Sequence, residues 1–277
     1  MKKLTPQQEL IYNDGERLIP GVTHDLDEEI RHRSSYRFFR KIIENDIASS
    51  ELRGRTITIL DLGCGTGHGS RELAEISGSR VTGVDISPDS IAYAKENYCA
   101  GNVDYLVADM QKVIAEMPVY DYIVSRHAIE HVPDGLDLCL SLKWGRRMMI
   151  NVPYNEPPGN EYHVLTEISK DSFPKHPGTE FFYEDLHGVT FYEETNAEIN
   201  SIVGIYSDPA LPSVSQSLAF PYAAWTPSEF QILHGRALQL ETKVSQLEAR
   251  IIQLDSQLAE TNSLLLIRIM RKIRRMF

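Results

Sequence analysis

The sequence has few cysteines, no long apolar run and no excess of basic residues. Its 277 residues include three cysteines, Cys64, Cys99 and Cys139, without C-x-x-C spacing. We therefore expect neither a disulfide framework nor a structural zinc site. We expect instead that the chain resides in a reducing compartment. Because no run of about 18 apolar residues occurs and the N-terminus lacks an apolar signal region, we expect a cytoplasmic chain with no signal peptide and no membrane span.

The charge of the chain is acidic overall and unevenly distributed. Lys and Arg number 28 against 39 Asp and Glu, which gives a formal net charge of −11. This balance argues against a nucleic-acid partner, because binding along a phosphate backbone needs clustered basic side chains. Residues 263–277 differ from the rest, since they carry five basic residues and no acidic one.

The order of hydrophobic patterns predicts an α/β fold. From 56 to about 208, short β-rich runs alternate with helical ones, which is typical of a Rossmann-like, mostly parallel sheet. Seven strands are expected over 56–62, 80–85, 103–107, 120–125, 147–152, 181–191 and 198–206, the last two as a C-terminal antiparallel hairpin. Helices are expected over 27–47, 67–77, 88–98, near Val113, 135–142 and 166–173.

Composition divides the chain into five parts. We expect an N-terminal helical lid at 1–50, the α/β domain at 51–208, a proline-rich linker at 209–230, a coiled coil at 231–262 and a basic amphipathic tail at 263–277. The tail has apolar residues beside its basic ones. It therefore suits either the anionic inner-membrane surface, as a peripheral contact, or an acidic partner such as a glycosyltransferase.

A heptad pattern predicts that 231–262 forms a long coiled-coil helix. The a positions are Ala237, Val244, Ile251 and Leu258, and the d positions include Leu240, Leu247 and Leu254. β-Branched residues at a with leucine at d favour a parallel homodimer, with a trimer or a helix folded back on the domain as alternatives. The charges agree with a parallel pair: Lys243 and Arg250 are at g, and Glu248 and Asp255 are at e.

A glycine-rich turn follows the first expected strand. Its glycines are Gly63, Gly65 and Gly67. Glycines at such a turn let the backbone approach a ligand closely. His68 and Ser70 stand where a dinucleotide-binding turn would carry its third glycine, and the Gly-Lys-Ser/Thr of a P-loop is absent. Asp85 ends the second expected strand, where an acid can accept hydrogen bonds from ribose hydroxyls.

Four motifs, in order, resemble those of class I S-adenosylmethionine-dependent methyltransferases. They lie at 60–67, 84–87, 108–110 and 120–125. The resemblance implies S-adenosyl-L-methionine as cofactor, with the three glycines along its methionine and ribose portions. It implies that Asp61 anchors the glycine loop and the methionine amine, and that Asp85 holds the ribose. The rest of the implied cofactor site consists of Ile86, Asp109, Met110 and Ser125.

Candidate catalytic residues follow the fourth expected strand. Methyl transfer to a hydroxyl needs alignment and a base that takes the acceptor proton. His127, Glu130 and His131 are the candidates, and the two histidines share one face if the segment is helical. Their H-x-x-E-H pattern resembles an E-x-x-E-H element that binds a divalent metal in some O-methyltransferases, and departs from it at the first position. The resemblance implies a metal held by these three residues and His163; the alternative is that Glu130 and His131 only pack beneath the cofactor.

Two further segments bear on the acceptor. The insertion at 153–177 contains Tyr154, Tyr162 and His163, and this polar and aromatic mixture suits a sugar with its hydroxyls. At the N-terminus, 15–20 and the following helix resemble a subgroup with a G-E-R-x-x-P opening and an E-H-x-x-R-Y-x-F helix, often found in bacterial surface-polysaccharide gene sets. Arg31 and Ser35 depart from it, standing where Glu and Arg are expected.

The combined expectation is a methyltransferase of the EC 2.1.1 type. Its acceptor would be a sugar hydroxyl of a bacterial surface polysaccharide, of O-antigen or capsule type, or of the lipid-linked precursor. A small metabolite or quinone-type phenol is the alternative acceptor. A scaffold that keeps the cofactor fold and recruits glycan-assembly partners through its coiled coil is the alternative without catalysis.

Overall fold

The computed structural model describes residues 4–226 except 16, 23–25, 50, 51, 53 and 196, together with residues 229, 235, 242–254 and 256–258. The chain forms two units, Met1–Ala224 and Trp225–Phe277. The tail expected at 263–277 lies outside the described residues, as does much of the expected coiled coil.

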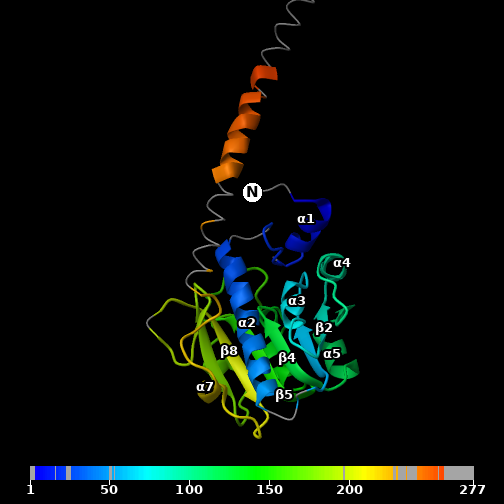
Figure 1. Ribbon diagram of the computed structural model, residues 1–277, viewed down its shortest axis with the longest axis vertical. Coiled ribbons are helices and arrows are strands. Elements are labelled where there is room, and N and C mark those ends of the chain that lie inside the picture. Colours follow the sequence, from blue (N-terminus) through cyan, green and yellow to red (C-terminus); the bar gives the residue numbers. More distant parts are fainter. Residues whose placement is uncertain are drawn as a thin grey trace, which may run out of the picture. The chain divides into compact units, whose positions relative to one another are not determined.

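A single sheet runs through the first unit (Figure 1). Among the described residues its nine strands are β1 Ile57–Leu62, β2 Ser79–Asp85, β3 Val103–Val107, β4 Tyr120–Arg126, β5 Trp144–Pro153, β6 Glu180–Asp185, β7 Val189–Phe191, β8 Ile199–Ser207 and β9 Tyr222–Ala223. Their order is β3-β2-β1-β4-β5-β8-β6-β7-β9. The first five strands are parallel, and β8 is antiparallel to both of its neighbours. The expected mostly parallel sheet with an antiparallel pair is confirmed.

The sheet has two more strands than the sequence predicted. The run expected as one strand at 181–191 is divided by a turn at Gly188, whose φ is +73°, so it forms β6 and β7. The other additional strand, β9, pairs with β7 and comes from the expected linker. Val214, in the short helix α7 Val214–Ser217, is fully buried. The part of the expected linker before residue 225 therefore belongs to the first unit.

Helices cover both faces of the sheet. On one face, α2 Leu26–Ala48 and α3 His68–Leu73 pack against apolar residues of β1, β4 and β5. On the other face, α5 Met110–Glu116, the 3-10 turn η1 Ile129–His131 and α6 Gly135–Cys139 pack against the same central strands. The N-terminal helix α1 Pro6–Asn13 contacts α4 Pro88–Asn97, which packs on β3.

Helix α2 is fixed to the sheet by apolar packing and by a buried ion pair. Its expected apolar face, Phe38, Phe39, Ile42 and Ile43, is buried. Near its C-terminus, Asp46 accepts hydrogen bonds from Arg147 of β5 at 2.8 and 3.0 Å, and Arg147 is fully buried. Removing one member of such a pair typically costs about 3–5 kcal/mol. The N-terminal half of α2 is thereby held at the edge of the sheet where the parallel strands end.

The helix expected at 166–173 does not form. Only Lys170–Ser172 makes a 3-10 turn. The preceding residues pair with the start of the same insertion instead: Asn155 N–H donates to the Ile168 carbonyl at 2.9 Å, and Glu167 N–H donates to the Glu156 carbonyl at 2.8 Å. Glu167 also has φ of +54°, which is incompatible with a continuing helix.

In the second unit, residues 242–254 and 256–258 are helical. The apolar heptad residues of this stretch are 41–60% exposed; they are Val244, Leu247, Ile251, Leu254 and Leu258. No helix in the described part of the chain combines the length and apolarity that crossing a bilayer requires.

Candidate active site

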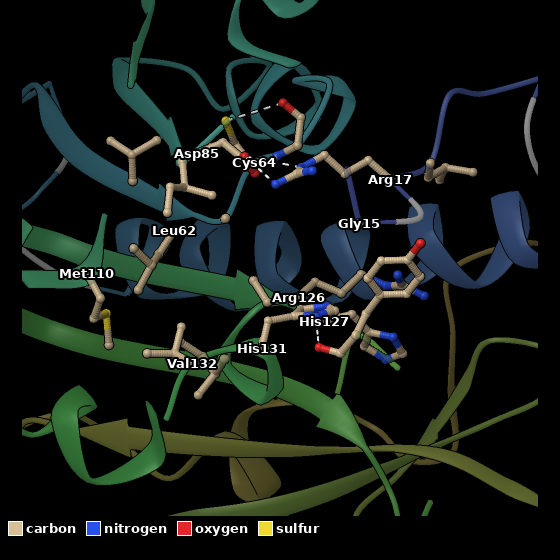
Figure 2. Close-up of a pocket in the computed structure, with 18 of the residues that line it drawn as sticks. Gly15, Arg17, Leu62, Cys64, Asp85, Met110, Arg126, His127, His131 and Val132 are labelled. Atoms are coloured by element: carbon tan, nitrogen blue, oxygen red, sulfur yellow. Dashed lines mark hydrogen bonds and ion pairs between the residues drawn. The ribbon is translucent and has the colours of Figure 1, made fainter. Parts of the chain in front are cut away.

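A cavity of about 630 Å³ lies where the parallel strands end (Figure 2). The ends of β1, β2 and β4 contribute Leu62, Asp85 and Arg126, and an N-terminal segment contributes Arg17. This is the edge at which open α/β sheets bind their ligands, because the loops after parallel strands converge there.

The glycine loop forms one side of the cavity. Gly63 has φ of +75°, and a Cβ at this position would lie 2.2 Å from Cβ of Ala128, so the loop after β4 leaves room for glycine only. Gly67, with φ of +88°, is the N-cap of α3, and a Cβ there would lie 2.6 Å from Cβ of Ala94. Gly65 has φ of +52°, and no atom of the described residues lies within 4 Å of a Cβ added there, so this position faces open space. Gly63 and Gly65 both line the cavity, and close packing at Gly63 and Gly67 leaves no room for a side chain.

Asp61 and Ser125 support this loop from behind. Asp61 is fully buried and accepts hydrogen bonds from the Tyr36 hydroxyl at 2.9 Å and the Ser70 hydroxyl at 2.6 Å. Burial raises the pKa of Asp61 to about 6. The Ser125 hydroxyl donates to the Leu62 carbonyl at 2.8 Å and ties β4 to β1. Both side chains therefore position the loop from the interior of the domain.

Asp85 lies at the end of β2 and faces the cavity. It accepts hydrogen bonds from Gly65 N–H at 3.0 Å and from Ser87 N–H at 2.9 Å, which fix the carboxylate. Arg17 Nη2 lies 3.1 Å from its Oδ1. The Arg17 segment is held by Thr66, whose hydroxyl donates to the Leu18 carbonyl at 2.7 Å. Arg17 is a cavity residue that sequence reasoning missed, although the motif around it was noticed.

The far end of the cavity suits a flat aromatic ring. Ile86 lines it and is 64% exposed, and the buried Met110 lines it as well. Asp109 is the N-cap of α5, where its carboxylate accepts a hydrogen bond from Lys112 N–H at 2.8 Å. An exposed isoleucine beside a buried methionine offers apolar surface that a purine would cover. The fixed acid, the open glycine and this apolar end together fit S-adenosylmethionine.

His131 lies on the opposite side of the cavity, in η1 (Figure 2). Its Nδ1 lies 2.8 Å from the Tyr162 carbonyl oxygen, which only accepts, so Nδ1 carries the proton and donates. Burial lowers the pKa of His131. The ring is therefore neutral at pH 7, with an unprotonated Nε2 that can accept a proton.

Glu130 and His163 lie beside His131. Glu130 is fully buried, its carboxylate oxygens have no hydrogen-bond partner among the described residues, and burial raises its pKa to about 8. His163 packs edge-on against His131 with 4.8 Å between ring centroids. One ligand atom from each of the three residues falls within 4.8 Å of the others. Two imidazoles and a carboxylate suit a divalent transition metal, so this donor set fits the metal that the resemblance implies.

His127 and Tyr154 are placed apart from these three residues. His127 lines the cavity, with Nε2 2.9 Å from the Ser201 hydroxyl and φ of +46°, and burial lowers its pKa. It is not part of the Glu130 cluster. Tyr154 donates to the Glu194 carboxylate and packs edge-on against Tyr183; it does not line the cavity, unlike Tyr162 and His163.

Comparison with known proteins agrees with this geometry. Residues 59–141 match the family model described as "Methyltransferase domain". The chain is 36% identical over 140 residues to phosphoethanolamine N-methyltransferase 1 of Zea mays, covering 48% of this chain and 26% of that protein. It is 35% identical over 100 residues to the ubiquinone biosynthesis O-methyltransferase of Xylella fastidiosa, covering 34% and 40%. The chain thus spans less than half the length of these curated relatives.

A solved structure supports the fold. The plantazolicin methyltransferase, in a complex with a triazolic analogue and S-adenosylhomocysteine, has a TM-score of 0.52 at 12% identity, covering 73% of this chain and 92% of that chain. At such identity the likeness concerns the fold alone. Residues 59–141 are thus a methyltransferase domain by the family model that they match.

Proposed function

We propose that this chain transfers the methyl group of S-adenosylmethionine to a hydroxyl group, with Nε2 of His131 as the base. When bound, the cofactor supplies an electrophilic methyl group. The observation that carries the proposal is the hydrogen bond from His131 Nδ1 to the Tyr162 carbonyl, because it leaves Nε2 as the proton acceptor in the cavity. General-base catalysis of this kind contributes about 10²–10⁴-fold in rate.

The acceptor we propose is a sugar hydroxyl of a bacterial surface polysaccharide or of its lipid-linked precursor. Asn160, Tyr162 and His163 line the acceptor side of the cavity with polar and aromatic groups, which suit a sugar ring and its hydroxyls. The N-terminal segment that resembles the polysaccharide-associated subgroup contributes Arg17 and Leu18 to the same cavity. The sequence likeness to a ubiquinone biosynthesis O-methyltransferase favours a small phenol as the second candidate acceptor.

The carboxyl group of Glu130, which has no hydrogen-bond partner among the residues that the structure describes, favours a metal-assisted form of the same reaction. Glu130, His131 and His163 would hold a divalent cation, which lowers the pKa of a coordinated hydroxyl. Dialysis against EDTA, followed by repletion with Mn²⁺, Zn²⁺ or Mg²⁺ singly, separates the two forms. Activity that is lost and then restored by one ion supports the metal. Undiminished activity leaves His131 as the base without a metal.

We infer that the helical residues 242–254 and 256–258 pair with the same residues of a second copy of this chain in parallel. Its apolar heptad residues are exposed, and an apolar stripe of this kind is buried by a second helix. Charge decides the direction: in a parallel pair the basic g residues face acidic e residues, as Lys243 of one copy faces Glu248 of the other. An antiparallel pair would bring basic g residues together. A trimer would instead give three times the mass of one chain in light scattering.

Acceptor identity is tested with methyl-labelled S-adenosylmethionine and the purified chain. One reaction receives a lipid-linked glycan fraction, a second receives catechol-type phenols, and a third receives neither. We expect label in the glycan fraction, removed by mild acid that releases the glycan from its lipid. Label in the phenols alone would show that the acceptor is a phenol and not a sugar, while methyl transfer to a hydroxyl group would still hold. No transfer to any acceptor, with intact cofactor binding, would support the scaffold alternative.

A further inference from the structure

Arg126 is a charged residue of the cavity wall that the proposed reaction does not use. It ends β4 and lines the cavity (Figure 2). It lies two residues before the Ala128 that abuts Gly63, and Glu28 and His32 line the same cavity. Its side chain is 4% exposed. A guanidinium group stays charged at this depth, so it requires negative partners.

The partners of Arg126 leave one edge of the guanidinium group available. Nε donates to the Ser35 hydroxyl at 3.1 Å, and Nη2 donates to Glu28 Oε1 at 3.1 Å. Nη1 has no hydrogen-bond partner among the described residues. Because Arg126 lines the cavity, this remaining nitrogen can donate to a ligand there.

The charge around Arg126 is incompletely balanced. Glu28 also accepts from Arg31 Nη2 at 2.7 Å, so two guanidinium groups share one carboxylate. Burial opposes the ionisation of Glu28, but Arg126 and other nearby charges outweigh it and lower the pKa to about 2. Glu184, joined to Arg126 through Ser35, is only partly ionised at neutral pH because burial raises its pKa to about 7. An anionic ligand would supply the missing charge.

Other groups of the cavity are less suited to bind an anion. Burial, followed by the field of Arg126, lowers the pKa of His32, so this ring is neutral at pH 7. Arg17 already pairs with Asp85 and with Asp14, each at 3.1 Å. Ser35 stands where the resemblance expects an arginine, and the guanidinium group of Arg126 lies against it from β4. The cationic group expected on α2 is thus replaced from another element.

We propose that Arg126 binds the α-carboxylate of the methionine portion of S-adenosylmethionine. This rests on the proposed function, because it assumes that the adenine portion lies toward Ile86 and Met110 and the ribose at Asp85. The methionine portion then extends past Gly63 toward the end of β4. A carboxylate there accepts a charge-assisted hydrogen bond from Nη1 and completes the charge balance of Arg126 with Glu28.

The test compares two ligands that differ only in the carboxylate. Calorimetry measures S-adenosylhomocysteine and its decarboxylated analogue, which keeps the adenosine, thioether and amine, on the full chain and on Arg126→Gln, Arg126→Lys and the surface control Arg80→Gln. We expect the unmodified chain and the control to prefer S-adenosylhomocysteine by about tenfold to hundredfold. Arg126→Gln should lose this preference while it keeps its affinity for the analogue, and Arg126→Lys should retain part of the preference.

The outcomes separate this inference from the proposed function. If Arg126→Gln weakens both ligands equally, Arg126 has a structural role and the inference is wrong. An unchanged preference in Arg126→Gln, or no preference in the unmodified chain, overturns it as well. If the unmodified chain binds neither ligand, the proposed function fails and the inference fails with it. Binding of the analogue by Arg126→Gln also shows that the variant has folded.

Discussion

The two sides of the cavity differ in how completely their polar groups are paired. On the cofactor side, Asp61 has two hydroxyl donors, and Asp85 has two backbone donors and an arginine. On the acceptor side, Glu130 is fully buried without a hydrogen-bond partner in the part of the chain that the structure describes. His131 is fixed through Nδ1 alone.

This difference separates a preorganised binding surface from a reactive one. The paired carboxylates hold the glycine loop in place before a ligand arrives, so little ordering is needed on binding. A buried carboxyl group without a hydrogen-bond partner costs free energy that the fold must supply, and such groups concentrate at functional sites. We therefore expect changes on the cofactor side to alter affinity or stability, and changes on the acceptor side to alter the rate.

The largest expected effect is that of His131→Asn. The asparagine amide can still donate to the Tyr162 carbonyl, but it lacks Nε2, so kcat should fall by about 10²–10⁴-fold. Calorimetry should give an affinity for S-adenosylhomocysteine within about twofold of the unmodified chain. The matched control is His187→Asn, at an exposed position in the turn after β6. Full turnover by His131→Asn would show that His131 is not the base, and it would contradict the proposed difference between the two sides of the cavity.

An intermediate effect is expected from two alanine substitutions in the glycine loop. Gly63→Ala places a methyl group against Ala128 and should lower the free energy of unfolding by about 2–5 kcal/mol, from overpacking and a positive φ together. Gly65→Ala meets no atom within 4 Å and should cost only about 1–2 kcal/mol.

Ligand binding should also distinguish Gly65→Ala from Gly63→Ala. The added methyl group of Gly65→Ala borders the cavity and should reduce affinity for S-adenosylhomocysteine by about tenfold or more. Denaturant titration and calorimetry on both variants measure the two effects. A Gly65→Ala chain that binds normally would show that the cofactor does not approach the loop.

Substitutions in the C-terminal helix should have the smallest effect on catalysis and cofactor binding. Leu247→Asp places a charge at a d position of the heptads, whereas Ile252→Asp changes a b position that is 70% exposed. Light scattering should give a dimer mass for the unmodified chain and for Ile252→Asp, and about half that mass for Leu247→Asp. Neither variant should alter kcat or cofactor affinity. A monomeric unmodified chain would contradict the pairing, and a threefold mass would replace the dimer by a trimer.

The sequence predicted the cavity residues at the strand ends but not the contacts that distant segments make with them. Asp85 ends β2 and Met110 begins α5 shortly after β3, so the strand pattern alone brings them to one edge. Arg17 reaches Asp85 across 68 residues, and Arg126 reaches Ser35 across 91. Pairs so distant depend on how α2 and the N-terminal segment pack, which no local pattern specifies.

On the acceptor side, the sequence indicated which residue types take part but not how they group. Val164 and Leu165 both donate backbone hydrogen bonds to the Glu130 carbonyl at 2.9 Å, which brings His163 to His131. The spacing of His127 and His131 would put them on one face if the segment were helical, but only the short turn η1 forms there, and His127 contacts Ser201. The path of the insertion, which was expected to be helical at 166–173, decides this arrangement.

The most direct test of the central claim is calorimetry of S-adenosylhomocysteine binding to the full chain and to Asp85→Asn. We predict saturable binding with one site per chain, and an affinity at least about tenfold lower for Asp85→Asn, because the ribose hydroxyls lose a charged acceptor. The absence of binding, or equal affinity in the two proteins, would contradict a cofactor site at the ends of β1 and β2.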